Sequence, residues 1–321
     1  MNEAFAPDWE LDYYSRPILE SDGKKRWELL ICSTPVTGQS RPASNNPDGA
    51  ETNGSVNNGA ENNGFENNAT AKSFRWVLPC PASSVNSIWL KEALQQALGA
   101  AADEGFGPPR RLRCWRGSMR TMVQRAAEGL GLELVASRRC YALVSWLQER
   151  ERDVYPLEEG YMQGPLAPPP VALRPVAVPL PEAARGESWA WATLPLAALG
   201  EANDWEMGFC GLVPLPEGLD PEATVPGIRL FSASRSLALA GWIAGLEPVR
   251  LDIADQQLVL EAGLDDRWLL TNLPESEADT AAETFRTARE RAGGLQFLAV
   301  QAREEEPRFE GFWLLRDLPD A

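Results

Sequence analysis

The sequence predicts a two-domain protein of mixed α/β class. The chain of 321 residues is longer than one ordinary domain. Segments that alternate polar and apolar residues, as strands do, are interspersed with segments whose apolar residues recur every three or four positions, as in helices. A proline-rich stretch at 157–188, typical of a connector, divides these segments into an N-terminal domain at 1–156 and a C-terminal domain at 189–321.

The N-terminal domain is expected to begin with three strands. They are predicted at 9–19, 26–33 and 74–79, with turn-forming residues at 21–24 between the first two. Helices capped by Ser87 and Ser118, and a third over 139–152, then alternate with strands at 111–116 and 132–136. Three strands followed by alternating helix and strand is typical of a ribonuclease H-like strand order, which we predict here.

Residues 34–72 separate the second and third predicted strands. They are rich in Asn, Gly, Glu and Ser and contain very few apolar residues. Such a stretch cannot bury enough apolar surface to offset the entropy lost on ordering. We therefore expect 34–72 to be a disordered insert.

The C-terminal domain is expected to be a second mixed α/β sheet domain. Two helices are predicted, at 235–246 and 276–292, because small and apolar residues there recur at helical spacing. A hairpin is expected to turn at Gly263–Asp266. The predicted strands are 189–196, 205–213, 228–232, 258–261, 267–272, 295–302 and 311–318.

The charge distribution restricts where a polyanion could bind. The chain carries a formal net charge of −16, and residues 151–321 hold the whole excess, with 13 bases and 29 acids. Residues 110–140 run against this trend, with eight arginines and two acids. An acidic surface repels nucleic acid at long range, so a nucleic-acid site should be local and lie in the first half.

Composition also argues against several classes of site. The chain has no histidine, so histidine nucleophile systems and histidine metal sites are excluded. The five cysteines are widely spaced and form no C-x-x-C pair, which is typical of a reducing compartment. We predict no metal, no cofactor and no integral membrane segment. The N-terminus is unlike a transit peptide, so a cytoplasmic location is expected.

The arginine-rich segment has two interpretations. Arginines can hold phosphates and a tryptophan can stack on bases, which favours an RNA site. Alternatively, the same arginines pair with acids of the C-terminal domain. The residues alone leave both open, and the candidates are Arg110, Arg111, Arg113, Trp115, Arg116, Arg120, Arg125, Arg138 and Arg139.

A ribonuclease H-like domain raises the possibility of a nuclease. Two-metal hydrolysis needs several carboxylates that converge on the ions. Asp12 and Glu92 are candidates, but the fourth strand ends in Arg116, where a further acid would be needed. We predict no catalytic residue and no enzymatic activity.

Several long segments carry a resemblance to a known family. WELDYYSRPILESDGKKRWELLIC, WRGSMRTMVQRAAEGLGLELVASRRCYALVSWLQERERDVYP, FSASRSLALAGWIAGLEPVRL and FEGFWLLRDLP occur in order and resemble the Tab-two-like family. The resemblance implies an RNA-binding protein of cyanobacteria or chloroplasts that promotes translation of photosystem I reaction-centre messages, chiefly PsaB. It also associates RNA binding with Trp313, Leu314 and Leu315. Gln296 stands where the family pattern is expected to have histidine.

The combined hypothesis is an RNA-binding factor, without enzymatic activity, that acts in translation and photosystem I biogenesis. Its expected partners are that messenger RNA and the translation or photosystem assembly machinery. Two alternatives remain: a protein-interaction or assembly factor that does not bind RNA, and a divergent ribonuclease H-like nuclease.

Overall fold

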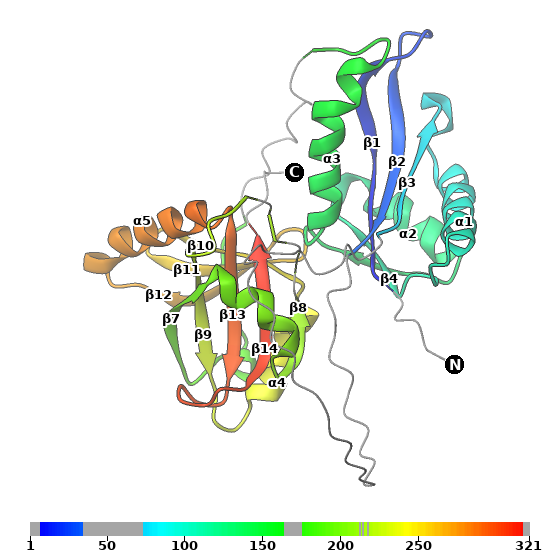
Figure 1. Cartoon of the computed structure of the whole chain (residues 1–321). Coiled ribbons are helices and arrows are strands. Elements are labelled where there is room, and N and C mark those ends of the chain that lie inside the picture. Colours follow the sequence, from blue (N-terminus) through cyan, green and yellow to red (C-terminus); the bar gives the residue numbers. More distant parts are fainter. Residues whose placement is uncertain are drawn as a thin grey trace, which may run out of the picture.

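The computed structural model describes residues 7–34, 73–163 and 175–316, except 212, 214 and 217. These residues form two lobes, each built around β-sheet (Figure 1). The predicted mixed α/β class is confirmed. Most of the insert predicted at 34–72, and residues 164–174 of the proline-rich stretch, lie outside the described residues.

The N-terminal lobe contains a five-stranded sheet of order β3-β2-β1-β4-β5. β1 pairs antiparallel with β2 and parallel with β4. The outer pairs follow suit: β2 and β3 are antiparallel, and β4 and β5 are parallel. The predicted succession of elements is confirmed, while its identification as ribonuclease H-like stays a prediction. The strands are β1 (Trp9–Leu19), β2 (Lys25–Ser33), β3 (Arg75–Cys80), β4 (Arg111–Cys114) and β5 (Glu133–Ala136).

Helices cover both faces of this sheet. α1 (Ser87–Asp103) and α2 (Arg120–Glu128) pack on one face, and α3 (Tyr141–Asp153) lies on the other (Figure 1). Because side chains of a strand alternate between faces, Trp9, Leu11 and Tyr13 of β1 belong to the core under α1 and α2. The charged residues between them therefore point to the face of α3.

Three helix starts differ from the prediction. Asn86, not Ser87, caps α1: its side-chain oxygen accepts hydrogen bonds of 2.9 Å from the N–H groups of Ile88 and Trp89. Ser118 lies in a short 3₁₀ turn, and α2 begins at Arg120 without a side-chain cap. α3 begins at Tyr141, so Arg139 precedes it. Adjacent polar residues offer competing caps, and tertiary contacts choose among them.

The C-terminal lobe contains a five-stranded sheet of order β7-β9-β13-β14-β8 and a four-stranded sheet of order β10-β11-β12-β6. β10 was missed by the sequence prediction although its apolar residues alternate. The elements are β6 (Val178–Pro179), β7 (Ser188–Pro195), β8 (Met207–Gly211), β9 (Thr224–Phe231), α4 (Ser236–Gly245), β10 (Pro248–Ala254), β11 (Gln257–Ala262), β12 (Asp266–Asn272), α5 (Glu275–Arg291), β13 (Leu295–Gln301) and β14 (Phe309–Arg316). Short 3₁₀ turns occupy Ala82–Ser84, Gly117–Met119, Tyr155–Leu157, Glu182–Ala184 and Leu196–Asp204.

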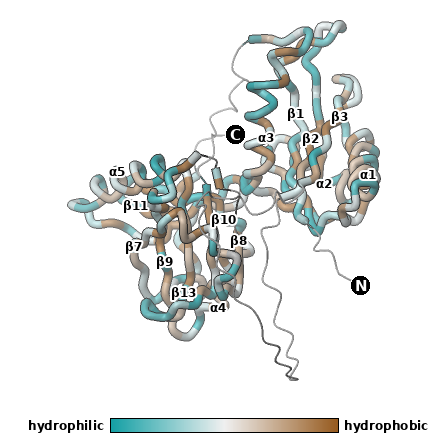
Figure 2. Tube along the Cα trace, viewed as in Figure 1, coloured by the Kyte–Doolittle hydropathy of each residue, from teal (hydrophilic) through white to brown (hydrophobic). Residues whose placement is uncertain are grey.

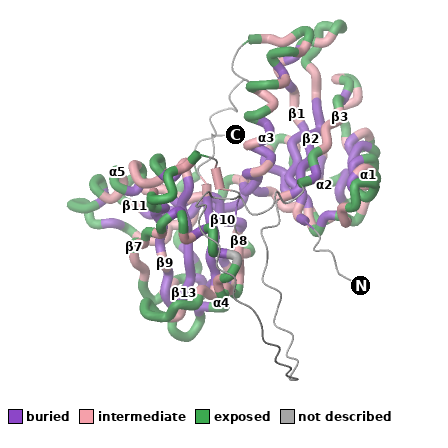
Figure 3. Tube along the Cα trace, in the orientation of Figure 1, coloured by how far each residue is buried: buried purple, intermediate pink, exposed green. Residues whose placement is uncertain are grey.

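Apolar side chains concentrate between the sheets and the helices that cover them. Figure 2 shows hydrophobic positions along the central strands, and Figure 3 shows that these positions are buried, whereas the outward faces of α1 and α5 are exposed. The central strand β13 is buried along its whole length. In contrast, β8 lies at an edge of its sheet, and this edge strand faces the N-terminal lobe.

Candidate nucleic-acid interface

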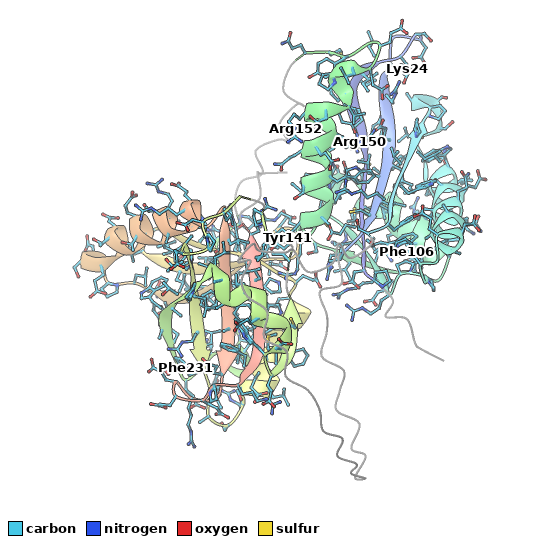
Figure 4. The ribbon with its side chains drawn as sticks, viewed as in Figure 1. Lys24, Phe106, Tyr141, Arg150, Arg152 and Phe231 are labelled. Atoms are coloured by element: carbon cyan, nitrogen blue, oxygen red, sulfur yellow. The ribbon has the colours of Figure 1, made fainter. Side chains whose placement is uncertain are left out.

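The two lobes meet around the start of α3. Figure 4 places Tyr141 at the end of α3 that meets the C-terminal lobe, with Arg150 and Arg152 further along the helix. The Tyr141 hydroxyl donates a 2.8 Å hydrogen bond to the carbonyl of Val249 and accepts one of 3.3 Å from the N–H of Arg316. The N–H of Arg138 donates to the carbonyl of Gly263 at 2.8 Å. These bonds join the two lobes directly.

Arg139 fixes the same junction with its side chain. Its guanidinium donates to three carbonyls of the C-terminal lobe: Nη1 to Pro248 at 2.7 Å, and Nη2 to Gly211 and Leu314 at 2.6 and 3.1 Å. A Cβ atom at Gly211 would lie 2.7 Å from Nη2 of Arg139, so this close approach requires glycine. Because all three acceptors are neutral, no carboxylate cancels the charge of Arg139 in these bonds.

Three further arginines come from the start of β4. Arg113 donates from Nε to Glu247 at 2.7 Å, and its Nη2 lies 2.9 Å from Asp8. Arg111 bridges the same two acids at 3.0 Å each, and Arg110 donates to Asp8 at 3.0 Å. Glu247 belongs to the C-terminal lobe, so its ion pairs with Arg111 and Arg113 cross between the lobes.

Both acids stay ionised in this setting. Burial acts to raise the pKa of Asp8, but the hydrogen bond from Arg110 and the charges of Arg113 and Arg111 outweigh it, and the pKa is lowered. Burial also acts to raise the pKa of Glu247, but the charge and the hydrogen bond of Arg113 outweigh it, and the pKa of Glu247 is lowered. Glu247 raises the pKa of Arg113 against the effect of burial, so Arg113 stays cationic.

Glu247 holds its position at a local cost. It follows Leu246, the C-cap of α4, and has φ of 57°, in the left-handed region where glycine is favoured. A non-glycine residue there costs about 1–2 kcal/mol. In this conformation the carboxylate of Glu247 pairs with Arg113 and Arg111, which indicates that the ion pairs stabilise the fold by more than the backbone conformation costs.

These arginines line a hollow between the lobes, which we call the interlobe cleft. It encloses about 410 Å³, and one wall is the whole of edge strand β8. Four arginines and Glu247 line it, and Asp8 pairs with three of these arginines from behind the lining; these four arginines and two carboxylates sum to a balance of +2. Its lining residues are Arg110, Arg111, Arg113, Arg139, Trp205, Met207, Gly208, Phe209, Cys210, Gly211, Ala244, Glu247, Pro248 and Trp313.

A second set of charges lies on the same face of the first sheet, beneath α3. We call it the inner network: Arg16, Arg116 and Arg150 with Asp12, Glu28 and Glu151. Nη1 of Arg16 lies 2.8 Å from Asp12, and Nε of Arg116 donates to Asp12 at 2.6 Å.

The inner network occupies the position considered for a nuclease. Asp12 is fully buried and is held by two guanidinium groups, which oppose metal binding. Glu92 is exposed on α1, which covers the opposite face of the sheet. Within the described ranges, no group of three or more Cys, Asp or Glu side chains is arranged to hold a metal ion.

The other predicted RNA residues are distributed over several environments. Trp115 is buried, and Arg116 lies over the rings of Tyr14 and Trp115 at 4.1 and 4.6 Å. Arg138 pairs with Glu261 at 2.7 Å. Arg120 and Arg125 are exposed on α2.

The predicted Trp313-Leu314-Leu315 segment lies on β14 and is buried. Trp313 lines the interlobe cleft, and the carbonyl of Leu314 is one of the acceptors of Arg139. Leu315 packs in the core of the C-terminal lobe. The structure therefore brings Arg110, Arg111, Arg113, Arg139 and Trp313 together around one hollow.

Comparison with known proteins agrees with this two-lobed organisation. Residues 8–150 match the family model described as RNA-binding protein Tab2/Atab2 N terminal, and residues 168–316 match the model of the Tab2/Atab2 C-terminal domain. The chain belongs to the Tab2/Atab2 family of RNA-binding proteins.

Two plant relatives in this family are similar over nearly the whole chain. The protein named TAB2 homolog, chloroplastic, of Zea mays is 34% identical over 97% of this chain and 72% of its own length. The protein of the same name from Arabidopsis thaliana is 32% identical over 97% of this chain and 75% of its own length. No solved structure matches. No helix among the described residues is long and apolar enough to cross a membrane.

Sequence reasoning missed three parts of the cleft in this Tab2/Atab2 chain. Asp8 and Glu247 were not singled out, because isolated acids give no signal before their arginine partners are known. The predicted strand at 205–213 included β8, but nothing in its sequence indicated that it would face the arginines. The sequence Leu246-Glu247-Pro248 after α4 offered one hint, since glutamate stands where a helix end favours glycine.

Proposed function

We propose that this protein binds RNA at the interlobe cleft and promotes translation of photosystem I reaction-centre messages. The observation that carries the proposal is the balance of +2 in the cleft of a chain whose net charge is −16. An unbalanced cluster of arginines attracts a polyanion at short range, and the acidic remainder restricts binding to that place.

Support for the role in translation comes from the family. Membership in Tab2/Atab2 supports RNA as the partner, and the sequence resemblance supports a photosystem I message and a function in photosystem I biogenesis. The cytoplasmic location, the contribution of the translation or assembly machinery, and the absence of enzymatic activity stay predictions. The ion pairs of Arg111, Arg113 and Arg138 with acids of the C-terminal lobe match the alternative interpretation of those three arginines.

A charge-removal experiment tests the cleft. Arg110 and Arg111 are the accessible arginines of the cleft, with side chains 60% and 22% exposed. The double variant Arg110→Ala, Arg111→Ala should weaken RNA retention in a filter assay and reduce the slope of log affinity against log salt by about 1.4, as expected for two lost phosphate contacts on a single strand.

The matched control removes two arginines elsewhere. Arg152 and Arg286 are exposed and, like Arg110, pair with neighbouring acids. Arg152→Ala, Arg286→Ala should leave affinity and salt slope close to those of the wild type. Equal weakening by both double variants would show that RNA binding depends only on the overall charge of the protein, and would reject the cleft as the binding site.

The message itself requires a measurement in cells. Crosslinking followed by sequencing of bound RNA should enrich photosystem I reaction-centre messages with the wild-type chain, and less so with Arg110→Ala, Arg111→Ala. Enrichment of unrelated messages only would reject the translational role and leave RNA binding in place.

A further inference from the structure

The interlobe cleft has the dimensions and the chemistry of a site for part of one RNA strand. We propose that it accepts a single unpaired nucleotide, with the phosphate at Arg110 and Arg111 and the base against β8, beside the rings of Trp205 and Phe209. This inference rests on the proposed RNA-binding function and specifies its ligand. The ligand is single-stranded RNA, of which the cleft holds one nucleotide.

The size of the cleft selects one nucleotide. Its volume of about 410 Å³ lies in the range of small-ligand sites, roughly 300–1,000 Å³. Double-stranded RNA is instead recognised over an open surface that spans about 16 base pairs. A duplex therefore cannot enter a hollow of this size, whereas an unpaired nucleotide can be turned out of its strand into it.

The arginines keep hydrogen-bond donors for a phosphate. Arg110, Arg111 and Arg113 donate hydrogen bonds to Asp8 and Glu247 through Nε and Nη2. No hydrogen bond within the described parts of the chain uses Nη1 of any of the three. The two acids thus orient the guanidinium groups without consuming all their donors, and each guanidinium carries five N–H donors.

The opposite wall suits a base. Among the described residues β8 pairs with β14 on one side only, so alternate N–H and C=O groups of this edge strand point away from the sheet, and Arg139 occupies the carbonyl of Gly211 at its end. Backbone groups of this kind can hydrogen-bond the edge of an unpaired base. Trp205 and Phe209 are partly exposed and line the same wall, which provides aromatic surface for stacking.

Fluorescence anisotropy with the full chain tests the strand preference. The probe is a fluorescein-labelled RNA of about 12 nucleotides, alone or annealed to its complement. We expect binding to the single strand to be at least about tenfold tighter. Nucleoside 5′-monophosphates should displace the strand at concentrations at which ribose 5-phosphate does not. Equal binding of strand and duplex, or equal displacement by both competitors, overturns the inference.

A matched pair of aromatic variants tests the place. Phe209→Leu removes the ring but keeps apolar volume, and should weaken single-strand binding about tenfold while duplex binding stays unchanged. Trp191→Leu removes an aromatic side chain that is 42% exposed and lies outside the cleft, and should change neither. Thermal unfolding verifies that both variants fold, and the competition experiment on the wild type decides the inference even if Phe209→Leu does not fold.

The outcomes separate this inference from the proposed function. If RNA binding depends on Arg110 and Arg111 but Phe209→Leu binds like the wild type and strand and duplex bind alike, the nucleotide site is rejected and RNA binding stands. If the wild type retains neither form of RNA, the proposed function fails and the inference fails with it.

Discussion

The inner network and the interlobe cleft lie on the same face of one sheet, yet they differ in charge balance. In the inner network three arginines face three carboxylates beneath α3. In the cleft four arginines face two carboxylates beneath the C-terminal lobe. The charges of the inner network balance one another, whereas the cleft keeps an excess of positive charge beside an open volume.

This difference separates structural arginines from candidate binding arginines. Arg116 and Arg113 are close in sequence and both are largely buried, so charge density along the chain cannot distinguish them. What distinguishes them is the element that covers each one. Helix α3 of the same lobe places Glu151 near Arg116, whereas Arg113 meets a second lobe whose edge strand leaves a hollow.

The largest effect is expected in the inner network. Arg16→Met removes a fully buried cation and leaves Asp12 and Glu28 undercompensated. Removing one partner of a buried ion pair costs roughly 3–5 kcal/mol, so the free energy of unfolding measured with urea should fall by that amount. RNA affinity of the folded protein should not change. Arg286→Met, in an exposed pair, should leave the free energy of unfolding close to that of the wild type.

Glu247→Gln is expected to change stability and RNA binding in opposite directions. Arg113 loses its carboxylate partner across the lobes but keeps Asp8, so the free energy of unfolding should fall by about 3 kcal/mol. The balance of charge in the cleft rises from +2 to +3, so RNA affinity should increase and the salt slope should steepen. Unchanged affinity would show that the cleft is as closed to ligands as the inner network.

Glycine at the same position separates the carboxylate from the backbone. Glu247→Gly and Glu247→Ala both lose the ion pairs, but only glycine adopts φ of 57° without strain. The glycine variant should therefore be more stable than the alanine variant by about 1 kcal/mol in urea unfolding. If alanine is equally stable, the backbone has relaxed and Glu247 bears no strain.

The pH dependence of stability gives a fourth test. Burial raises the pKa of Glu10 to about 7 from 4.5, despite hydrogen bonding from the N–H of Leu143 and the charge of Arg113. A carboxyl with a raised pKa holds its proton longer in the folded state. Its contribution is therefore fully present below pH 4.5 and is lost as pH rises to about 7, by on the order of 3 kcal/mol.

Glu10→Gln removes that titration. The free energy of unfolding of the variant, relative to the wild type, should rise between pH 4.5 and about 7 in a series of urea titrations. A constant difference over this range would show that Glu10 is ionised throughout, and the cleft would then contain one more negative charge beneath Arg113.

Much of the fold followed from local patterns, but the pairing of the arginines did not. The alternation in Trp9–Leu19 and the helical spacing of Leu90, Ala93 and Leu94 are properties of neighbouring residues, and both elements were predicted correctly. The partner of Arg113 is Glu247, 134 positions away. Such a contact depends on how two lobes dock, and no periodicity in either segment encodes it.

The missed strand β10 is a different case, because its pattern is local. Val249, Leu251 and Ile253 alternate with polar residues, a recognisable strand pattern. The helix before it was predicted to end at 246, and the structure has Leu246 as the C-cap of α4, so the boundary was found but the strand after it was not assigned.

The smallest effect is expected from Arg120 and Arg125, which were predicted from sequence alongside the cleft arginines. Both are exposed on α2, and α2 packs on the sheet face opposite to the cleft. They can contact RNA only where a strand leaves the cleft and passes around the lobe. Arg120→Ala, Arg125→Ala should therefore weaken binding by about twofold in the filter assay, much less than Arg110→Ala, Arg111→Ala. A loss equal to that of the cleft variant would move the main phosphate contacts to α2, and the excess charge of the cleft would then be a structural feature like the inner network.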